Sequence, residues 1–332
     1  MKVETENIDP DEQLGDLLGG FAGTQLLYVV AELGIADALG EGAQSADALA
    51  ERLRVVPHVL YRFLRALASH GVFEQDADGR FKNTPASELL RRDDASAWRD
   101  YAIVYGSVYQ AFAEALPAVR TGENMFSRVN GVDWWRWLER NPGLGSIFNR
   151  AMQAGAQRRV ELISGLEWRD GETVVDVGGG NGTLVIELLQ RQPTLSGVVF
   201  DLPEVTSEAG SRVQEAGLSH RCKVVGGSFF DDVPTGGDVY VLAKVLHDWN
   251  DTAAERILTT VRAAAPDHAR LLVVDLVVPP GNSPHPSKEL DLVMLSLVDG
   301  RERDEVEWRQ LLDSGGFRPI SIGDGLIEAV PK

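Results

Sequence analysis

The chain has little cysteine and no excess of positive charge. Cys222 is the single cysteine among its 332 residues, so an internal disulfide cannot form and a cysteine-based metal site is excluded. Lysine and arginine number 32 against 50 aspartates and glutamates, which gives a formal net charge of −18. This acidic balance argues against nucleic acid or an anionic membrane as a partner. No clustered set of metal ligands is evident, and we expect no metal.

Long hydrophobic runs are also missing. No apolar stretch reaches the length that we would expect of a membrane span. The first residues, 1–6, are acidic and lack the apolar region of a signal peptide. Apolar residues nevertheless make up 44% of the chain, which is ample for two domains, or for one domain and a large helical part. We therefore expect a soluble cytoplasmic α/β protein without a membrane partner.

The most informative segment that is present is rich in glycine, at residues 172–183. An apolar run ends at Asp176, and four glycines then fall within five positions before a helical pattern begins. This predicts a buried strand, a tight turn and a helix around a nucleotide-sized pocket, because glycine lets a ligand approach the backbone closely. The spacing is Asp-x-Gly-x-Gly-x-Gly, with Gly178 and Gly180 in it. A dinucleotide motif would need Gly or Ala at Thr183, which disfavours a nicotinamide enzyme. The form resembles S-adenosylmethionine (SAM) methyltransferases.

A second acidic residue supports a nucleotide site. Residues 198–200 read as another short buried strand, and Asp201 ends it about twenty residues after the glycines. An acid at this place can accept both ribose hydroxyls of an adenosine. The alternative is that Asp201 only begins a turn before Pro203.

The N-terminal part predicts helices, one of them unusually apolar. Residues 13–33 have a helical pattern whose apolar side includes Leu14, Leu17, Leu18 and Phe21. A helix that faces solvent does not need so apolar a surface. We expect another element or another chain to cover it.

Two helices and a hairpin follow. Ser45 is placed to cap one helix, Pro57 begins the next, and Gly71 lies just past its end. The hairpin turns at Asp78-Gly79. This succession is typical of a winged helix, so a non-enzymatic DNA-binding regulator is one alternative. The acidic chain and the apolar candidate recognition helix favour an interaction module instead.

The rest of the chain predicts a helical middle and a mostly parallel sheet. Residues 96–166 are helical and rich in aromatic side chains, which suits a pocket for a flat aromatic substrate beside a cofactor domain. From residue 172 strands and helices alternate, and the end predicts an antiparallel hairpin at 317–330. The expected fold is α/β: a Rossmann-like C-terminal sheet with an antiparallel terminal hairpin, after a mostly helical, winged-helix-like part. The expected divisions are 1–95, 96–165 and 166–332.

His247 is the candidate general base. It follows the fourth predicted strand, at the sheet edge where α/β proteins bind ligands, and its pKa lies near the working pH. Asp275 ends the fifth strand at the same edge, and Glu302 follows a later helix. A carboxylate on the second ring nitrogen would orient the imidazole. The structural alternatives are a core histidine, a turn aspartate, and a glutamate that pairs with a neighbouring arginine.

These motifs together resemble the small-molecule O-methyltransferases of the plant caffeate and hydroxyindole type, in their bacterial natural-product branch, over nearly the whole chain. The motifs that carry the resemblance are Asp176–Gly182, Phe200–Pro203, Gly227–Phe230, Leu246–Asp251 and Gly300–Arg303. The resemblance implies SAM as the methyl donor, S-adenosylhomocysteine as its product, an aromatic acceptor with a phenolic hydroxyl, and no metal. It also implies a homodimer with interlocked N-terminal helices.

The resemblance assigns roles to individual residues. The catalytic set is His247, Asp275 and Glu302. The cofactor-binding set is Asp176, Gly178, Gly180, Asp201, Leu202, Gly227, Ser228, Phe229 and Lys244. The substrate-binding set is Trp134, Phe148, Asn149, Met152, Asp248 and Met294. Asp248 is also a candidate to cap the next helix or to pair locally.

Three positions depart from the plant members. Ser228 stands where they carry Asp, Ala243 where they carry Lys, and Asp275 where they carry Glu. Lys244 is one position further along and, on a strand, would point to the opposite face. Asp275 reaches about one methylene less far toward His247. A family member that keeps SAM but hydroxylates, decarboxylates or performs a pericyclic reaction remains an alternative, which product mass would distinguish.

Overall fold

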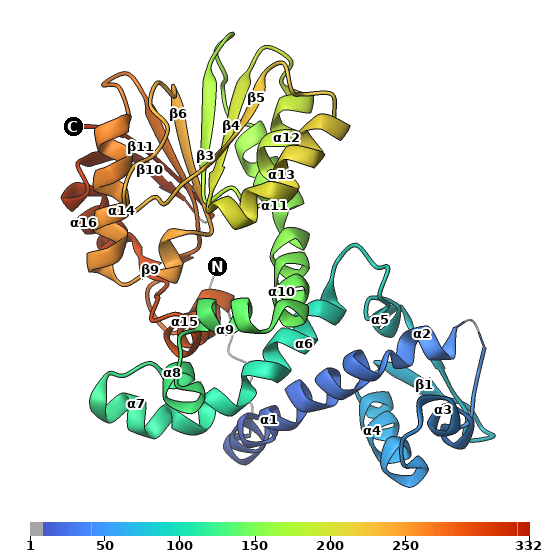
Figure 1. Ribbon diagram of the computed structural model, residues 1–332. Coiled ribbons are helices and arrows are strands. Elements are labelled where there is room, and N and C mark those ends of the chain that lie inside the picture. Colours follow the sequence, from blue (N-terminus) through green and yellow to red (C-terminus); the bar gives the residue numbers. More distant parts are fainter. Residues whose placement is uncertain (1–8, 41, 324) are drawn as a thin grey trace. The chain divides into compact units, whose positions relative to one another are not determined.

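The computed structural model describes residues 9–40, 42–323 and 325–332, which form two compact units. The first unit takes the described residues up to Ala113 together with Leu138–Ala154, and the second takes Glu114–Trp137 and Gly155–Lys332. The expected middle division, 96–165, is therefore shared between both units. The ribbon is shown in Figure 1.

The first unit is mostly helical. Its elements are α1 (Pro10–Leu33), α2 (Ile35–Leu39), α3 (Ala46–Leu53), α4 (Pro57–Ser69), β1 (Phe73–Gln75), β2 (Phe81–Asn83), α5 (Pro85–Glu88), α6 (Trp98–Val108) and α10 (Pro142–Ala154). The 3-10 helix η1 (Tyr109–Glu114) and α9 (Trp134–Arg140) cross from one unit to the other.

The local signals in this unit are confirmed. The Ser45 hydroxyl accepts a hydrogen bond from the Ala48 amide and so caps α3, and α4 begins at Pro57. Gly71, just beyond α4, has a positive φ of 73°, which glycine adopts without a Cβ penalty. Strands β1 and β2 pair antiparallel around the predicted turn.

Helix α1 has the predicted apolar face, and no described element of the chain covers it. Leu14, Leu17, Leu18 and Phe21 are 60%, 74%, 77% and 62% exposed. The expectation that no segment is long and apolar enough to cross a membrane was wrong for this helix, which has a mean hydropathy of 1.3 over an 18-residue window. One such helix is weak evidence for a membrane span.

The second unit contains helices and a seven-stranded sheet. Its helices are α7 (Ala115–Thr121), α8 (Met125–Asn130), α11 (Ala156–Ser164), α12 (Thr183–Arg191), α13 (Pro203–Glu215), the 3-10 helix η2 (Leu246–Asp248), α14 (Asp251–Ala264), α15 (Pro286–Leu297) and α16 (Glu305–Ser314). Its strands are β3 (Thr173–Val177), β4 (Ser196–Asp201), β5 (Cys222–Gly226), β6 (Val239–Ala243), β7 (Arg270–Val274), β8 (Val277–Val278), β9 (Arg303–Asp304), β10 (Phe317–Gly323) and β11 (Leu326–Pro331).

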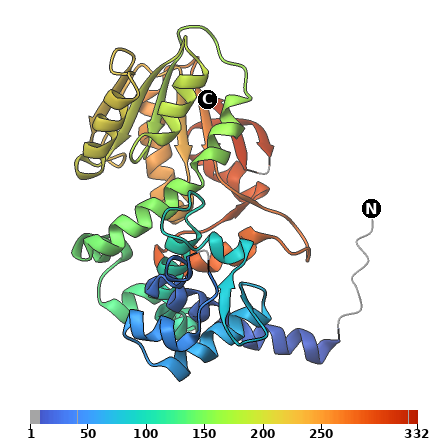
Figure 2. The ribbon, with the colours of Figure 1, turned by 90° about the vertical axis from the view of Figure 1, so that its right-hand side faces the viewer.

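The sheet order is β10-β11-β7-β6-β3-β4-β5, which confirms the expected architecture. Strands β3 to β7 are parallel, and β10 and β11 form the antiparallel hairpin at one edge. Helices cover both faces, as in Figure 2. Neighbouring β3 residues alternate between two cores: Val175 packs in the core that contains α14 and α16, and Val174 in the core that contains α11, α12 and α13.

Candidate active site

The glycine loop after β3 has the geometry that its sequence predicts. Gly178 and Gly180 have φ values of 77° and 58°, in the left-handed region that favours glycine. A Cβ on Gly178 would lie 2.7 Å from the Val245 side chain, so a larger residue would displace that neighbour. A Cβ on Gly180 would meet nothing within 4 Å, which leaves open space beside the backbone there.

Asp201 at the end of β4 is held beside this loop. Its Oδ2 accepts a hydrogen bond of 2.8 Å from the Gly180 amide, and its Oδ1 one of 2.7 Å from the Leu202 amide. Burial raises the pKa of Asp201, although these two amide hydrogen bonds oppose the rise. A carboxylate oxygen can accept more than one hydrogen bond, so Asp201 keeps capacity for ribose hydroxyls.

Asp176 lies in strand β3, one residue before the strand ends and the glycine loop begins. It is 2% exposed, and its Oδ2 has no hydrogen-bond partner among the described residues. Burial, with the nearby Asp201 carboxylate, raises its pKa to about 7. An adenosine nucleoside with a cationic end would require three features that are present here. They are the unpaired, buried Asp176 oxygen, the open space at Gly180 and the anchored Asp201 carboxylate. The residues present therefore fit SAM.

The segment after β5 adds the remaining predicted cofactor residues. The Gly227 amide donates to the Asp201 carbonyl at 2.9 Å, and a Cβ on Gly227 would lie 2.7 Å from the Phe200 ring. The Ser228 hydroxyl accepts a hydrogen bond from the Phe230 amide at 3.2 Å. The Phe229 ring packs edge to face on Phe230, with 5.0 Å between centroids. Ser228 and Phe229 thus both contact the neighbouring Phe230.

His247, on η2, is joined to both predicted acids. Its Nδ1 lies 2.7 Å from Glu302 Oε1 in a hydrogen bond and 3.7 Å from Asp275 Oδ1, which is beyond hydrogen-bonding distance. The close contact with the His247 ring is therefore made by Glu302 and not by the shorter Asp275 side chain. Nε2 lies 3.5 Å from Asp248 Oδ1. Asp248 therefore pairs locally, while Asn250 caps α14.

The charges around His247 raise its pKa. Burial alone would lower it, but Asp275, Asp248 and the hydrogen bond that His247 donates to Glu302 outweigh burial, so the pKa of His247 lies above its usual 6.5. Burial raises the pKa of Asp248 to about 6. The imidazolium is thus well stabilised, as a group that receives a proton requires.

Sequence reasoning missed the residue that fixes the position of His247. Arg303 is fully buried and donates to the Leu246 carbonyl at 2.9 Å and to the Trp249 carbonyl at 2.8 Å. These carbonyls flank His247, and the Arg301 amide donates to the His247 carbonyl itself. Because Arg303 follows Glu302 directly, the same segment positions both His247 and Glu302, the partners of the 2.7 Å hydrogen bond. The position of Arg303 in the 300–303 motif is the sequence signal that could have identified it.

Lys244 lies differently from the prediction. It follows the last residue of β6 and has a φ of 58°, so the alternation of a strand does not apply to it. Its ammonium Nζ lies 3.2 Å from Asp275 Oδ1, beside the catalytic set. A contact of this lysine with the cofactor remains a prediction.

The donor atoms of His247, Asp275 and Glu302 lie within 4.8 Å of one another, a spacing that could also hold a metal ion. However, Nδ1 is already hydrogen bonded to Glu302, and the Lys244 ammonium lies next to Asp275. These two contacts already engage the cluster, and a role for it as a base with charged partners stays a prediction.

The predicted substrate residues fall in both units. Trp134 on α9 is buried and packs edge to face on Phe126 at 5.1 Å, and Met294 lies buried on α15. Both belong to the second unit. Phe148, Asn149 and Met152 lie on α10 in the first unit. Their joint contact with a substrate stays a prediction.

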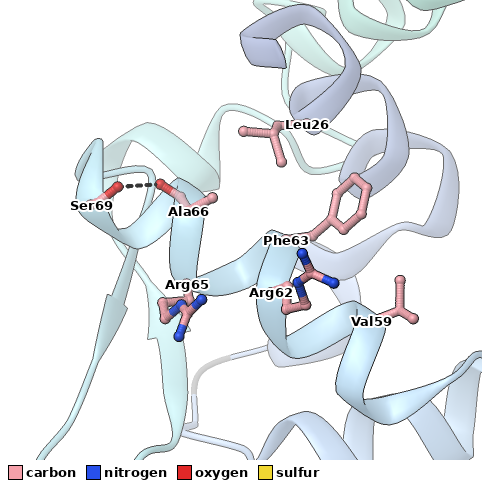
Figure 3. Close-up of a pocket in the computed structure, with 7 residues that line it drawn as sticks. All are labelled: Leu26, Val59, Arg62, Phe63, Arg65, Ala66 and Ser69. Carbon is pink, nitrogen blue, oxygen red and sulfur yellow. Dashed lines mark hydrogen bonds between the residues drawn. The ribbon is translucent and has the colours of Figure 1, made fainter. Parts of the chain in front are cut away.

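A groove of about 690 Å³ lies within the first unit and includes none of the predicted site residues. Leu26 of α1 faces Val59 and Phe63 of α4 across it, and Arg62, Arg65, Ala66 and Ser69 complete the lining (Figure 3).

Comparisons with known proteins agree over almost the whole chain. A family model of the O-methyltransferase domain matches residues 109–318, and one of the O-methyltransferase dimerisation domain matches residues 15–93. The phenazine O-methyltransferase PhzM of Lysobacter antibioticus is 39% identical over 95% of this chain and 94% of its own. The O-demethylpuromycin-O-methyltransferase of Streptomyces alboniger is 37% identical over 98% and 93%.

A solved O-methyltransferase from neocarzinostatin biosynthesis, NcsB1, superposes with a TM-score of 0.85 at 32% identity, over 98% of this chain and 100% of that one. It holds S-adenosylhomocysteine and 1,4-dihydroxy-2-naphthoic acid, and a second structure of it holds SAM and a naphthoic acid. The winged-helix-like part thus corresponds to a dimerisation domain, which removes the basis for the regulator alternative.

Proposed function

The chain belongs to the SAM-dependent O-methyltransferase family, and we propose that it methylates a phenolic hydroxyl of an aromatic small molecule with His247 as general base. The observation that carries the proposal is the 2.7 Å hydrogen bond between His247 Nδ1 and Glu302 Oε1. It fixes the ring and leaves Nε2 as the nitrogen that can accept a proton.

The chain's own residues supply the base and the cofactor cradle. Glu302 holds the imidazole in one orientation and stabilises it once Nε2 has taken the hydroxyl proton. Asp201 and the open backbone at Gly180 are proposed to bind the ribose and the adenosine, and Asp176 the cationic end; the anchored Asp201 carboxylate, the open space at Gly180 and the unpaired Asp176 oxygen support these roles. When bound, SAM supplies a methyl group that is already activated by its sulfonium. Positioning then contributes much of the rate, about 7–11 kcal/mol for well-oriented reactants.

The acceptor is proposed to be a flat hydroxylated ring system. Relatives are named for phenazine and puromycin methylation, and NcsB1 holds dihydroxynaphthoic acid. The predicted lining of Trp134, Phe148, Met152 and Met294 is aromatic and thioether in character, which suits a planar ring.

The first unit is proposed to form a homodimer. Its dimerisation-domain match includes most of the exposed α1 face (Leu17, Leu18 and Phe21) and the groove between α1 and α4. A second copy of the chain would cover both. We further propose a cytoplasmic location for the enzyme, which fits its single cysteine.

The test combines turnover, product mass and SAM affinity. Purified enzyme is incubated with SAM and hydroxylated naphthoates or phenazines, and the product is expected to gain one CH₂ unit per methyl. His247→Ala should lower kcat by at least about 100-fold, the usual contribution of a general base. Calorimetry should show nearly unchanged SAM affinity. Turnover like that of the wild type in His247→Ala would overturn the base assignment, and a product without added CH₂ would favour non-methylating chemistry.

A further inference from the structure

We propose that Lys244 is a positioning residue that offsets part of the charge of Asp275 and thereby keeps a larger fraction of His247 in its neutral, proton-accepting form. The inference rests on the proposed role of His247 as base. Lys244 Nζ lies 3.2 Å from Asp275 Oδ1, and the same oxygen lies 3.7 Å from His247 Nδ1. One carboxylate oxygen is therefore shared between an ammonium and the imidazole.

The need for such a balance follows from the count of charges. Three carboxylates face the His247 ring: Asp248 from η2, Asp275 from the segment after β7, and Glu302 from the segment before β9. Lys244, after β6, is the cation placed among these groups. Three negative charges on a single imidazole would hold it protonated near neutral pH, and a protonated imidazole cannot take a proton from the substrate.

Two arginines lie near these groups. Arg303 directs its guanidinium hydrogen bonds at Asp251 and at the Leu246 and Trp249 carbonyls, and it also attracts the Asp275 carboxylate through charge. Arg301 pairs with Asp251 and Glu307. Asp291 of α15 accepts the Glu302 amide and adds another negative charge nearby.

The backbone places the ammonium at Asp275. Lys244 adopts a φ of 58°, which is uncommon for a residue with a side chain and here follows directly on strand β6. The side chain is 28% exposed, but Nζ itself is buried and has no hydrogen-bond partner among the described residues. Its interaction with Asp275 is thus one of charge, which a guanidinium could replace and an uncharged side chain could not.

The experiment measures the titration of His247 directly and through kinetics. The full-length enzyme has six histidines, so the His247 imidazole signal is assigned in NMR spectra by its loss in His247→Asn. Lys244→Met should raise the titration midpoint of His247 by about one pH unit, the lower end of what one neighbouring charge does. The acidic limb of the kcat–pH profile should move upward equally, so that kcat on that limb falls about tenfold.

Three controls separate charge from structure. Lys244→Arg should keep the midpoint close to that of the wild type. Asp275→Asn should lower it, and Lys244→Met with Asp275→Asn should bring it back toward the wild-type value. If Lys244→Met does not fold, the opposite shift in Asp275→Asn still tests the balance.

Each outcome either supports or overturns the proposed role of Lys244. An unchanged His247 midpoint in Lys244→Met overturns the proposal, including the case in which only SAM affinity falls, because the lysine would then serve the cofactor. A shifted midpoint with an unshifted kcat profile supports the charge balance but counts against His247 as the base. Matching shifts in both support the two proposals together.

Discussion

Replacement of Glu302 by glutamine removes one charge and keeps the shape of the side chain. Glu302 is 3% exposed, and its Oε1 accepts the 2.7 Å hydrogen bond from His247 Nδ1. Asp275 cannot take its place, because its oxygen lies 3.7 Å away. A hydrogen bond that involves a charged group contributes about 1.5–3 kcal/mol. Since 1.36 kcal/mol corresponds to a tenfold change, we expect kcat on the plateau to fall about 10- to 150-fold.

The pH profile gives a second readout with a defined sign. Glu302 is one of the groups that hold the pKa of His247 above its usual 6.5. Its loss should lower that pKa, so the acidic limb of kcat should move to lower pH while the plateau falls. Stopped assays with radiolabelled SAM between pH 5 and pH 9 would measure both. The matched control is Asp275→Asn, which removes a carboxylate without a hydrogen bond to the ring and should keep most of the plateau.

Two results would refute this reasoning. Plateau turnover of Glu302→Gln within about twofold of the wild type would mean that the short hydrogen bond does not assist proton acceptance. An equal or larger plateau loss in Asp275→Asn would mean that Asp275, despite its distance, is the functional partner of His247. Calorimetric titration with SAM would show that neither variant has lost its cofactor site.

Two further predictions concern the first unit. Gly106→Ala should lower the free energy of unfolding by about 1–3 kcal/mol, because its Cβ would lie 2.2 Å from the Tyr28 side chain on α1. The control is Gly210→Ala, whose Cβ would meet nothing within 4 Å. Equal melting temperatures of the two variants would contradict the packing. Phe21→Glu should convert the proposed dimer to monomer in light scattering, since Phe21 is 62% exposed on the apolar face of α1; a dimer that persists at micromolar concentration would place the interface elsewhere.

The sequence by itself determined the architecture and predicted which residues form the candidate site. The alternation of apolar runs and helical patterns predicts the parallel sheet, because a strand buried on both faces is continuously apolar. Asp176 lies near the end of β3, Asp201 ends β4 and His247 follows β6, and parallel strands bring their carboxyl ends to one edge. Gly178 and Gly180 predict the tight turn because few other residues adopt their positive φ angles.

Only the tertiary structure decided which groups touch. Glu302 and Asp275 are equivalent candidates in the sequence, and the difference between 2.7 Å and 3.7 Å depends on where the segment after α15 lies. Arg303 looks like a surface charge in the sequence, but its burial under the His247 segment makes it a donor to two carbonyls. Strand alternation fails at Lys244, because a positive φ redirects its side chain. Periodicity reports the face of an element, whereas these contacts depend on how segments far apart in sequence meet.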